Sequence, residues 1–330
     1  MHGFDLTFCA PKSVSLLRAL RADEVGAKAL AAAHETALAE AMEYLAEHAG
    51  YTRVHNGVTG EKDLVRLPGL VAVAYQHETS RCGDPHLHTH VIVPNRQARA
   101  DWKLVSLDGT SLYHEAKAAG VIYQATLRRE IHQSLGFEWE PVDPATGMAE
   151  IASVERESIT AWSRRASQLR DWAAHHLDSV EGPLTPAQLA AAQKATRPTK
   201  PEELAWGELQ QQWRADGRGL RRDRGAHAAA RAARRAAART PFDRARLART
   251  AEQIDKAAFT RADLVEIIGA QLPVDGEQSP LAAVEAAVDQ IGIRLTAPRA
   301  AHQREVNRTG SAGGSNYWIS TRGRSVRSSS

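Results

Sequence analysis

Three of the four histidines in one short stretch, AYQHETSRCGDPHLHTHVIVPN (residues 74–95), have the spacing of a metal site, and these are His77, His88 and His90. His88 and His90 lie two residues apart in an apolar, β-branched run, so both side chains should project from one face of a strand. The apolar run at 70–76 predicts a buried strand that leads into His77. Gly, Asp and Pro between the two runs predict a turn. If the strands pair as a hairpin, the three imidazoles converge on one point.

Three neutral imidazoles leave a divalent ion its full charge and open coordination positions. Such an ion suits a phosphate oxygen, because charge builds up on a phosphoryl group as it reacts. We expect Mg or Mn in use, with Zn or Ni also acceptable to imidazoles. His86 follows a proline, so we predict that it lies in the loop as an outer contact of the site. The alternative is that these histidines only pack on a half-buried strand.

Composition sets broad limits on the rest of the chain. The 330 residues are 43% hydrophobic and 25% charged, which is ordinary for a soluble globular protein. The net charge of +3 does not by itself indicate a nucleic-acid partner. Two cysteines without metal or redox spacing indicate a reducing compartment. We expect a cytoplasmic protein, since no signal peptide or membrane-spanning run is present.

The first residues predict a strand followed by a helix. Phe4 and Phe8 alternate with polar Asp5, which gives the strand one apolar face. We predict that a helix starts near Lys12 with Ser13 as its N-cap. A helix N-terminus with Lys and Ser can receive a phosphate, and the alternative is a simple cap with a solvated lysine.

Further elements follow from periodicity and turn signals. We predict a strand at 51–55, closed by a turn at Asn-Gly, and another short strand at 137–140. Apolar periodicity and end signals predict helices at 23–48, 111–135 and 151–176.

Two motifs resemble a known family. GFDLTFCAPKSVSLL (3–17) and HETSRCGDPHLHTHVIVPN (77–95) resemble the TrwC/TraI type of conjugative relaxase, within the HUH endonucleases. The resemblance implies an α+β fold, in which an antiparallel palm-like sheet is flanked by helices. It also implies nicking of one strand at a plasmid's origin of transfer. In that reaction a tyrosine attacks the scissile phosphate and stays linked to the 5′ end.

The resemblance assigns residues to this chemistry. His77, His88 and His90 match the three metal ligands, and Asp5 matches the carboxylate that orients a ligand histidine and assists deprotonation of the nucleophile. The position of Asp5 on a polar strand face agrees, because metal-bound imidazoles donate their second N–H to an outer acceptor. Without the motif, Asp5 would be interpreted as a surface carboxylate.

Basic residues near these motifs are candidates for DNA contact. Contacts to phosphates set the affinity for DNA but not the sequence preference. For each candidate below, the alternative is that the side chain is a solvated charge without a DNA contact. The candidates are Lys12, Ser13, Arg81, Arg164, Arg165, Lys194 and Arg197. The implied partners are single-stranded origin-of-transfer DNA, other relaxosome proteins and a secretion-channel coupling protein, in a bacterial cytoplasm.

The tyrosines depart from the family pattern. No tyrosine precedes Asp5, so we expect the nucleophile to be missing from this chain. Tyr75 shares strand parity with His77, but we predict a packing role for it. An alternative function is therefore a non-catalytic remnant that binds single-stranded DNA. A remote alternative is an unrelated three-His metalloenzyme. Metallo-β-lactamase-like sites need H-x-H-x-D-H, but Ile92 and Val93 occupy the last two positions, and a cupin-like site needs a different ligand order.

We predict four segments. Residues 1–216 form a relaxase domain that lacks its N-terminal part, and 217–250 form an Arg/Ala-rich linker or helix. Residues 251–299 form a small helical module with Thr260 as an N-cap. Residues 300–330 are rich in Gly, Ser and Arg and are predicted to be disordered. No G-x-x-x-x-G-K-[ST] motif occurs, so we expect no nucleotide cofactor and no helicase.

Overall fold

The structure is a computed structural model that describes five main segments and two short strands. The segments are 2–21, 23–177, 184–199, 204–237 and 259–291. The strands β8 (Ile293–Arg294) and β9 (Tyr317–Trp318) pair antiparallel. The second half of the predicted linker, 238–250, lies outside the described residues, as do 251–258 of the predicted module and nearly all of the predicted tail.

A three-stranded antiparallel sheet positions the candidate site. Its strands are β1 (Gly3–Cys9), β5 (Pro85–Pro94) and β4 (Val73–Thr79), in the order β1-β5-β4. Alternating side chains give the sheet two unlike faces, as the pleat requires. Along β5 the apolar face is buried, with Val91 2% and Val93 0% exposed. The predicted α+β fold with an antiparallel sheet is therefore confirmed.

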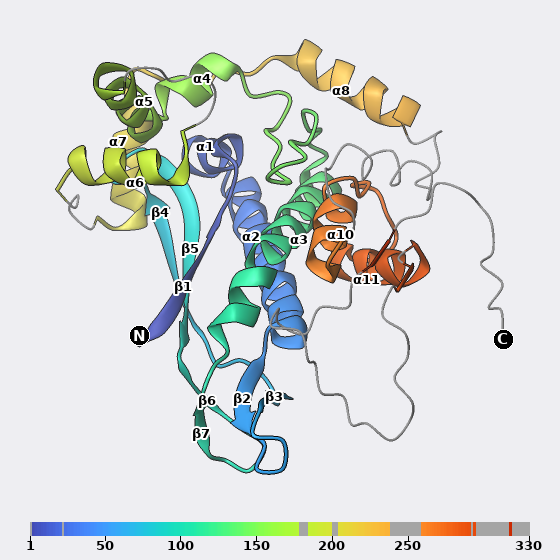
Figure 1. Ribbon diagram of the computed structural model, residues 1–330. Coiled ribbons are helices and arrows are strands. Elements are labelled where there is room, and N and C mark those ends of the chain that lie inside the picture. Colours follow the sequence, from blue (N-terminus) through green and yellow to red (C-terminus); the bar gives the residue numbers. More distant parts are fainter. Residues whose placement is uncertain are drawn as a thin grey trace.

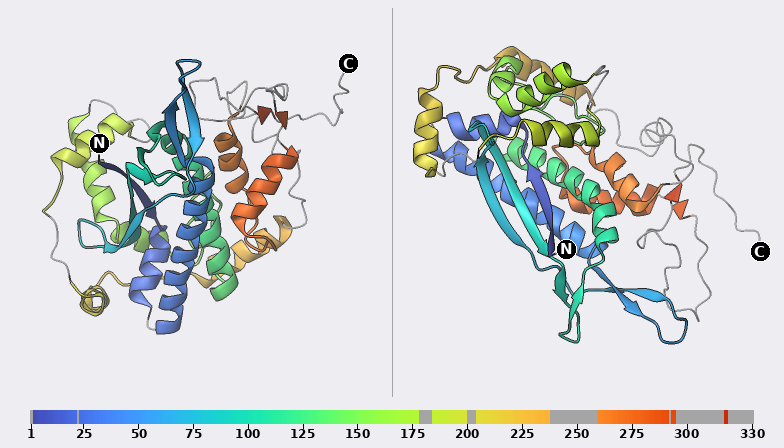
Figure 2. Two further views of the ribbon diagram at one scale, coloured as in Figure 1. Left: turned by 90° about the horizontal axis from the view of Figure 1, so that it is seen from below. Right: turned by 60° about the vertical axis from the view of Figure 1, so that its left-hand side comes forward.

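Two long helices cover the apolar face. Helices α2 (Glu24–His48) and α3 (Gly109–Leu135) lie side by side behind the sheet in Figures 1 and 2. Each begins at an aspartate whose side chain accepts a backbone N–H, and these caps are Asp23 and Asp108. Gly136 ends α3 in the left-handed conformation, with φ 66°. Helix α1 (Lys12–Leu20) packs beside them against β5.

The C-terminal helices pack directly on this helical layer. Helices α10 (Arg261–Gly269) and α11 (Pro280–Ile291) lie beyond α3 in Figure 1. Thr260 caps α10, as predicted. The buried guanidinium of Arg128 in α3 donates to the carbonyl of Gly269, at 3.5 Å, and to the carbonyl of Gly147 in the loop between α3 and α4. This buried contact joins α10 to the rest of the fold.

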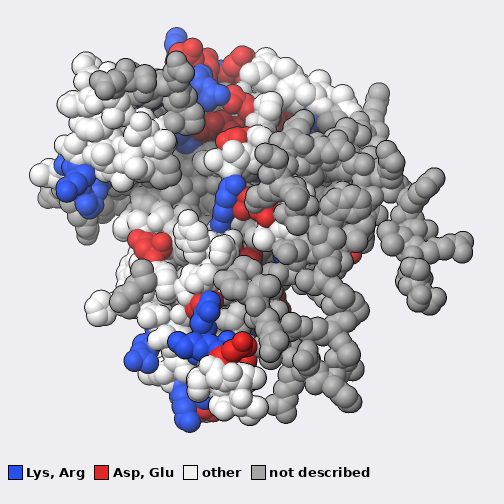
Figure 3. All heavy atoms as spheres, in the orientation of Figure 1, with Lys and Arg blue, Asp and Glu red and all other residues white. Residues whose placement is uncertain are grey.

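Two narrow ribbons extend from the lower end of the sheet. The first pairs β2 (Tyr51–His55) with β3 (Lys62–Arg66), and the second pairs β6 (Arg96–Ala98) with β7 (Leu104–Ser106). Figure 1 and the right-hand view of Figure 2 show both ribbons below the three-stranded sheet. Lys and Arg side chains gather at this lower end in Figure 3, with Asp and Glu among them.

Shorter helices lie at the upper end of the sheet, near the β4–β5 turn (Figure 1). They are α4 (Arg156–Ala161), α5 (Arg164–His176), α6 (Pro186–Ala195) and α7 (Trp206–Ala215). Helix α8 (Arg224–Ala237) lies apart from them, at the upper right of Figure 1. Helix α8 occupies part of the predicted Arg/Ala-rich linker. No helix of the described residues has the length and apolar character needed to cross a membrane.

Several local predictions were wrong for identifiable reasons. The helix predicted at 151–176 breaks at Trp162, because its indole is fully buried and donates to the carbonyl of Gly219 at 2.8 Å. The strand predicted at 137–140 reduces to one isolated bridge, Trp139↔Ile151. The run at 70–76 is not a buried strand, because β4 starts later and lies at the sheet edge. Tyr75 on β4 is 55% exposed, which does not fit its predicted packing role.

Candidate metal centre and its cleft

The three histidines converge as the hairpin model predicted. His77 pairs directly with His88 across β4 and β5, and His90 lies two residues further along β5. The ring centroids are 5.2 to 5.3 Å apart. One nitrogen from each ring lies within 4.8 Å of the other two. Three imidazoles from two paired strands therefore form a cluster that could hold a metal ion.

Outer contacts orient two of these rings. The Nδ1 of His88 lies 2.9 Å from the carbonyl oxygen of His86, and the Nδ1 of His90 lies 3.0 Å from both carboxylate oxygens of Asp5. With each Nδ1–H donated in this way, the Nε2 atoms remain for a metal, which is the usual arrangement of ligating histidines. Burial lowers the pKa of His88 and favours the neutral ligand form. The donor set therefore fits a divalent ion.

His86 lies in strand β5 and not in a loop, so that prediction was wrong. Its ring stacks on His88, with centroids 4.7 Å apart. Burial lowers the pKa of His86 to about 3. It is not one of the three clustered ligands. Its observed contacts with His88, through ring and carbonyl, agree with the predicted outer position.

A cleft of about 750 Å³ opens over the three histidines. The sheet forms its floor, while α1, α5 and α7 supply its walls. Basic and apolar side chains both line these walls, and they include Lys12, Arg81, Arg165, Leu169, Trp206 and Leu209. A cleft with cations beside apolar surface has the chemical character that single-stranded nucleic acid requires.

The start of α1 differs from the predicted phosphate site. Pro11, and not Ser13, is the N-cap. Glu150 occupies the helix N-terminus, because its carboxylate accepts the backbone N–H groups of Lys12 and Ser13 at 3.3 and 2.8 Å. Ser13 is fully buried, and its hydroxyl accepts the N–H of Ile151 at 2.8 Å. We therefore discard Ser13 as a phosphate contact.

Lys12 remains at the cleft. Its ammonium group donates to the carbonyl of Pro85 at 2.7 Å. Burial lowers the pKa of Lys12 to about 8, although the charges of Asp84 and Glu150 oppose this shift. Its position on the cleft wall keeps it a candidate for phosphate contact.

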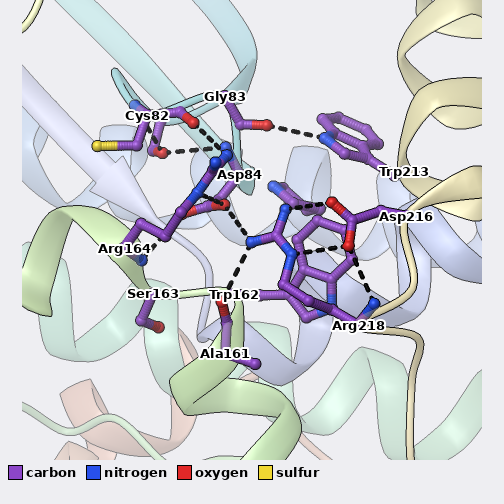
Figure 4. Close-up of polar contacts among 12 residues, drawn as sticks. Cys82, Gly83, Asp84, Ala161, Trp162, Ser163, Arg164, Trp213, Asp216 and Arg218 are labelled. Carbon is purple, nitrogen blue, oxygen red and sulfur yellow. Dashed lines mark hydrogen bonds and ion pairs between the residues drawn. The ribbon is translucent and has the colours of Figure 1, made fainter.

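Asp84, in the turn between strands β4 and β5 that carry the three histidines, forms a hub that the sequence did not indicate. Its side chain is 1% exposed and accepts from Arg164 Nε at 2.8 Å and from Arg218 at 2.9 Å. The backbone N–H of Arg164, at the start of α5, also donates to it at 2.9 Å. Figure 4 shows both guanidinium groups directed at this carboxylate. Arg164 is thus engaged in an internal ion pair.

Two tryptophans complete the hub. Trp213 in α7 donates from its indole to the carbonyl of Gly83 at 2.8 Å (Figure 4). Arg218 stacks on the ring of Trp162, with its guanidinium carbon 3.7 Å from the centroid. The turn is therefore joined to α4, α5 and α7, which carry or adjoin the cleft wall. The sequence showed only an aspartate before Pro85 in a predicted turn, and neither its burial nor its arginine partners could be predicted from that.

Of the other basic candidates, two line the cleft and two lie outside its lining. Arg165 lines the cleft and donates to the carbonyl and the hydroxyl of Thr196, both at 2.8 Å, so it joins α5 to the end of α6. Arg81 is exposed at the cleft. Lys194 and Arg197 are exposed at the end of α6 and just after it.

The fold and the site together define a class of protein. A three-stranded antiparallel sheet carries three histidines on one face, helices on the other, and a cleft above the histidines. The family model described as TrwC relaxase matches residues 1–220. The chain therefore belongs to the TrwC relaxase family, as the two motifs predicted.

Individual relatives agree with this assignment. The chain is 38% identical over 177 residues to the multifunctional conjugation protein TraI of Escherichia coli. That match covers 51% of this chain but only 9% of TraI. A metal-free structure of the conjugative relaxase TrwC with oriT DNA has a TM-score of 0.57 and 29% identity, covering 65% of this chain and 72% of that one. The copper-bound TrwC–oriT structure has a TM-score of 0.56 and 30% identity, covering 65% and 69%.

Proposed function

We propose that this chain acts as a relaxase on single-stranded origin-of-transfer DNA, with the scissile phosphate bound at the three-histidine centre. The observation that carries the proposal is the convergence of His77, His88 and His90 on one point at the floor of the cleft. The relatives with known structures were solved with oriT DNA, and one includes the cleavage site. The family membership and this geometry support the same activity.

The three histidines would hold the divalent ion through nitrogens that face one another. When bound, the ion supplies positive charge that stabilises a phosphoryl group during strand cleavage. Mg or Mn is the proposed ion, and the imidazole set also accepts Zn or Ni. The proposed reaction is a transesterification in which a tyrosine oxygen replaces the 3′ oxygen on phosphorus.

Asp5 has two proposed tasks. Its carboxylate holds the ring of His90 through Nδ1, which leaves Nε2 for the ion. It is also about half exposed, on the sheet face that carries the histidines, so it can accept the proton of the attacking hydroxyl. The proposed phosphate contacts along the cleft are Lys12, Arg81 and Arg165, with Lys194 and Arg197 further out. Relaxosome and coupling proteins are the proposed protein partners.

A cleavage assay tests the proposal. A labelled single strand carrying the origin of transfer of the chain's own plasmid is incubated with Mn²⁺, and products are resolved on a denaturing gel. Because no tyrosine precedes Asp5 in this sequence, the assay uses the chain alone and a fusion to a tyrosine-bearing N-terminal segment of a relaxase of this family. We expect strand-specific cutting and a covalent adduct with the fusion.

Matched variants give the controls. His88→Ala in the fusion should abolish both cutting and Mn²⁺ binding. His55→Ala changes an exposed histidine on the β2–β3 ribbon and should leave Mn²⁺ binding unchanged. Cutting that persists in EDTA or in His88→Ala would overturn the metal-dependent mechanism. Failure of both proteins to bind the origin strand would overturn the function itself.

A further inference from the structure

The sheet face that carries the histidines continues beyond His90 as an open apolar shelf. We define this shelf as Val73, Tyr75 and Ile92. Tyr75 stands directly opposite His90 in the β4–β5 register, and Val73 stands opposite Ile92. Directly paired residues project from the same face, with Cβ atoms about 5 Å apart. The tyrosine ring is therefore an immediate neighbour of the candidate metal centre.

The shelf is exposed, unlike the other face of the sheet. Tyr75 is 55% and Val73 46% exposed, whereas Val91, on the opposite face of β5, is 2% exposed. Tyr44 and Tyr123 are each 1% exposed within the helical layer. Among the tyrosine side chains that the structure describes, Tyr75 alone occupies the histidine face. Its exposed ring is therefore accessible to a ligand bound on the histidine face.

We propose that the ring of Tyr75 is a stacking platform for a nucleobase of single-stranded DNA, next to the phosphate held at the histidine centre. This inference rests on the proposed function. A nucleotide combines an anionic phosphate with a flat, largely apolar base. The cationic centre suits the phosphate, and the neighbouring shelf offers the aromatic surface that the base requires. Because every base has a π-face, this contact adds affinity without selecting sequence.

Three variants distinguish the effect of the Tyr75 ring on DNA binding from the effect of its hydroxyl group and from the effect of removing any exposed tyrosine. Tyr75→Ala removes the ring, and Tyr75→Phe keeps the ring but removes the hydroxyl. Tyr113→Ala is the matched control, because Tyr113 is 82% exposed but lies in α3. Mn²⁺ titration of each variant reports whether the histidine centre remains intact, since none of the three changes removes a ligand.

Two single-stranded probes separate base contacts from backbone contacts. One is a thymidine homopolymer, and the other is an abasic oligomer of the same length with the same phosphates. Their affinities are measured by fluorescence anisotropy in Mn²⁺. We expect Tyr75→Ala to weaken binding of the thymidine oligomer about tenfold, the scale of one lost base–aromatic stack. Its binding of the abasic oligomer should equal that of the wild type. Tyr75→Phe and Tyr113→Ala should bind both probes like the wild type.

Other results would overturn the proposal in distinct ways. If Tyr75→Ala binds the thymidine oligomer as tightly as the wild type, Tyr75 is not a stacking platform, but the proposed function is unaffected. An equal loss on the abasic probe, or a loss in Tyr75→Phe, assigns the contact to phosphate or to the hydroxyl. Light scattering that shows a wild-type dimer dissociated by Tyr75→Ala assigns the shelf to a second copy of the chain. A wild type that loads Mn²⁺ but binds neither probe contradicts the proposed function.

Discussion

Asp5 and His90 come from different strands and meet on the histidine face of the sheet. Both carboxylate oxygens of Asp5 lie 3.0 Å from Nδ1 of His90. Thr7, which is paired with His90 in the β1–β5 register, places its hydroxyl 3.1 Å from the same nitrogen. Asp5 therefore reaches His90 diagonally, one pleat along the strand. This contact fixes the ring orientation that a metal ligand needs.

Asp5→Asn should weaken Mn²⁺ binding about ten- to a hundredfold, the usual effect of removing an outer partner of a metal-bound histidine. The amide has no net charge, so it stabilises the ligand imidazole less. Isothermal titration calorimetry measures the change. Asp101→Asn is the control, because Asp101 lies in the β6–β7 turn and pairs with Arg99. Equal affinities for Asp5→Asn and wild type would remove the orienting role.

Asp84→Asn should weaken single-stranded DNA binding and leave Mn²⁺ affinity unchanged. The hub joins the β4–β5 turn to the cleft walls but touches none of the three ligands. Loss of the buried charge should also lower the free energy of unfolding by about 2 kcal/mol, as for charged hydrogen bonds. Asp216→Asn is the control, since Asp216 is partly exposed and Arg218 keeps its bond to Asp84. A matching loss in both variants would contradict a specific role for Asp84.

His34 should make the fold less stable in mild acid. It is fully buried and contacts Tyr123 and Thr89, both at 2.7 Å. Burial, with smaller repulsion from Arg18 and His88, lowers its pKa to about 4. Below the ordinary histidine pKa, near 6.5, the unfolded chain therefore binds a proton that the folded chain refuses until about pH 4. Acid thus favours unfolding.

Between about pH 7.5 and about pH 5, the contribution of His34 should lower the free energy of unfolding by about 2 kcal/mol. Urea titrations of the metal-free protein at both pH values measure it, with His34→Gln as the comparison. The variant should lose less stability over this interval, while other buried histidines contribute equally to both proteins. Identical pH dependence would show that His34 does not remain neutral in the folded state.

Lys194 and Arg197 should contribute to affinity through phosphates alone. The logarithm of affinity for single-stranded DNA should fall with the logarithm of salt concentration, with a slope of about 0.7 per contact. Replacing both residues by alanine should reduce the slope by roughly 1.4 if both contact phosphates. Lys28→Ala is the control, because the side chain of Lys28 is 80% exposed on α2 and pairs with Glu24 of the same helix. An unchanged slope in the double variant would remove these residues from the interface.

Sequence patterns were most reliable where the relevant distances are set within one strand or one hairpin. The two-residue spacing of His88 and His90 fixes their common face, and the short turn brings His77 opposite them. The cap at Thr260 and the end of α3 before Gly136 also follow from local chemistry. The single helix that periodicity predicted at 151–176 was wrong at Trp162, because the buried indole of this residue interrupts the helix.

The sequence by itself determined the three-histidine cluster, the family motifs and the antiparallel hairpin, because they depend on residue spacing and backbone geometry over a few residues. Only the tertiary structure decided what surrounds the centre. Glu150 closes the α1 N-terminus from a position 137 residues later, and Arg218 reaches Asp84 across 134 residues. The exposure of Tyr75 depends on which strand occupies the sheet edge. Such contacts depend on how distant segments pack, and short-range spacing carries no information about that packing.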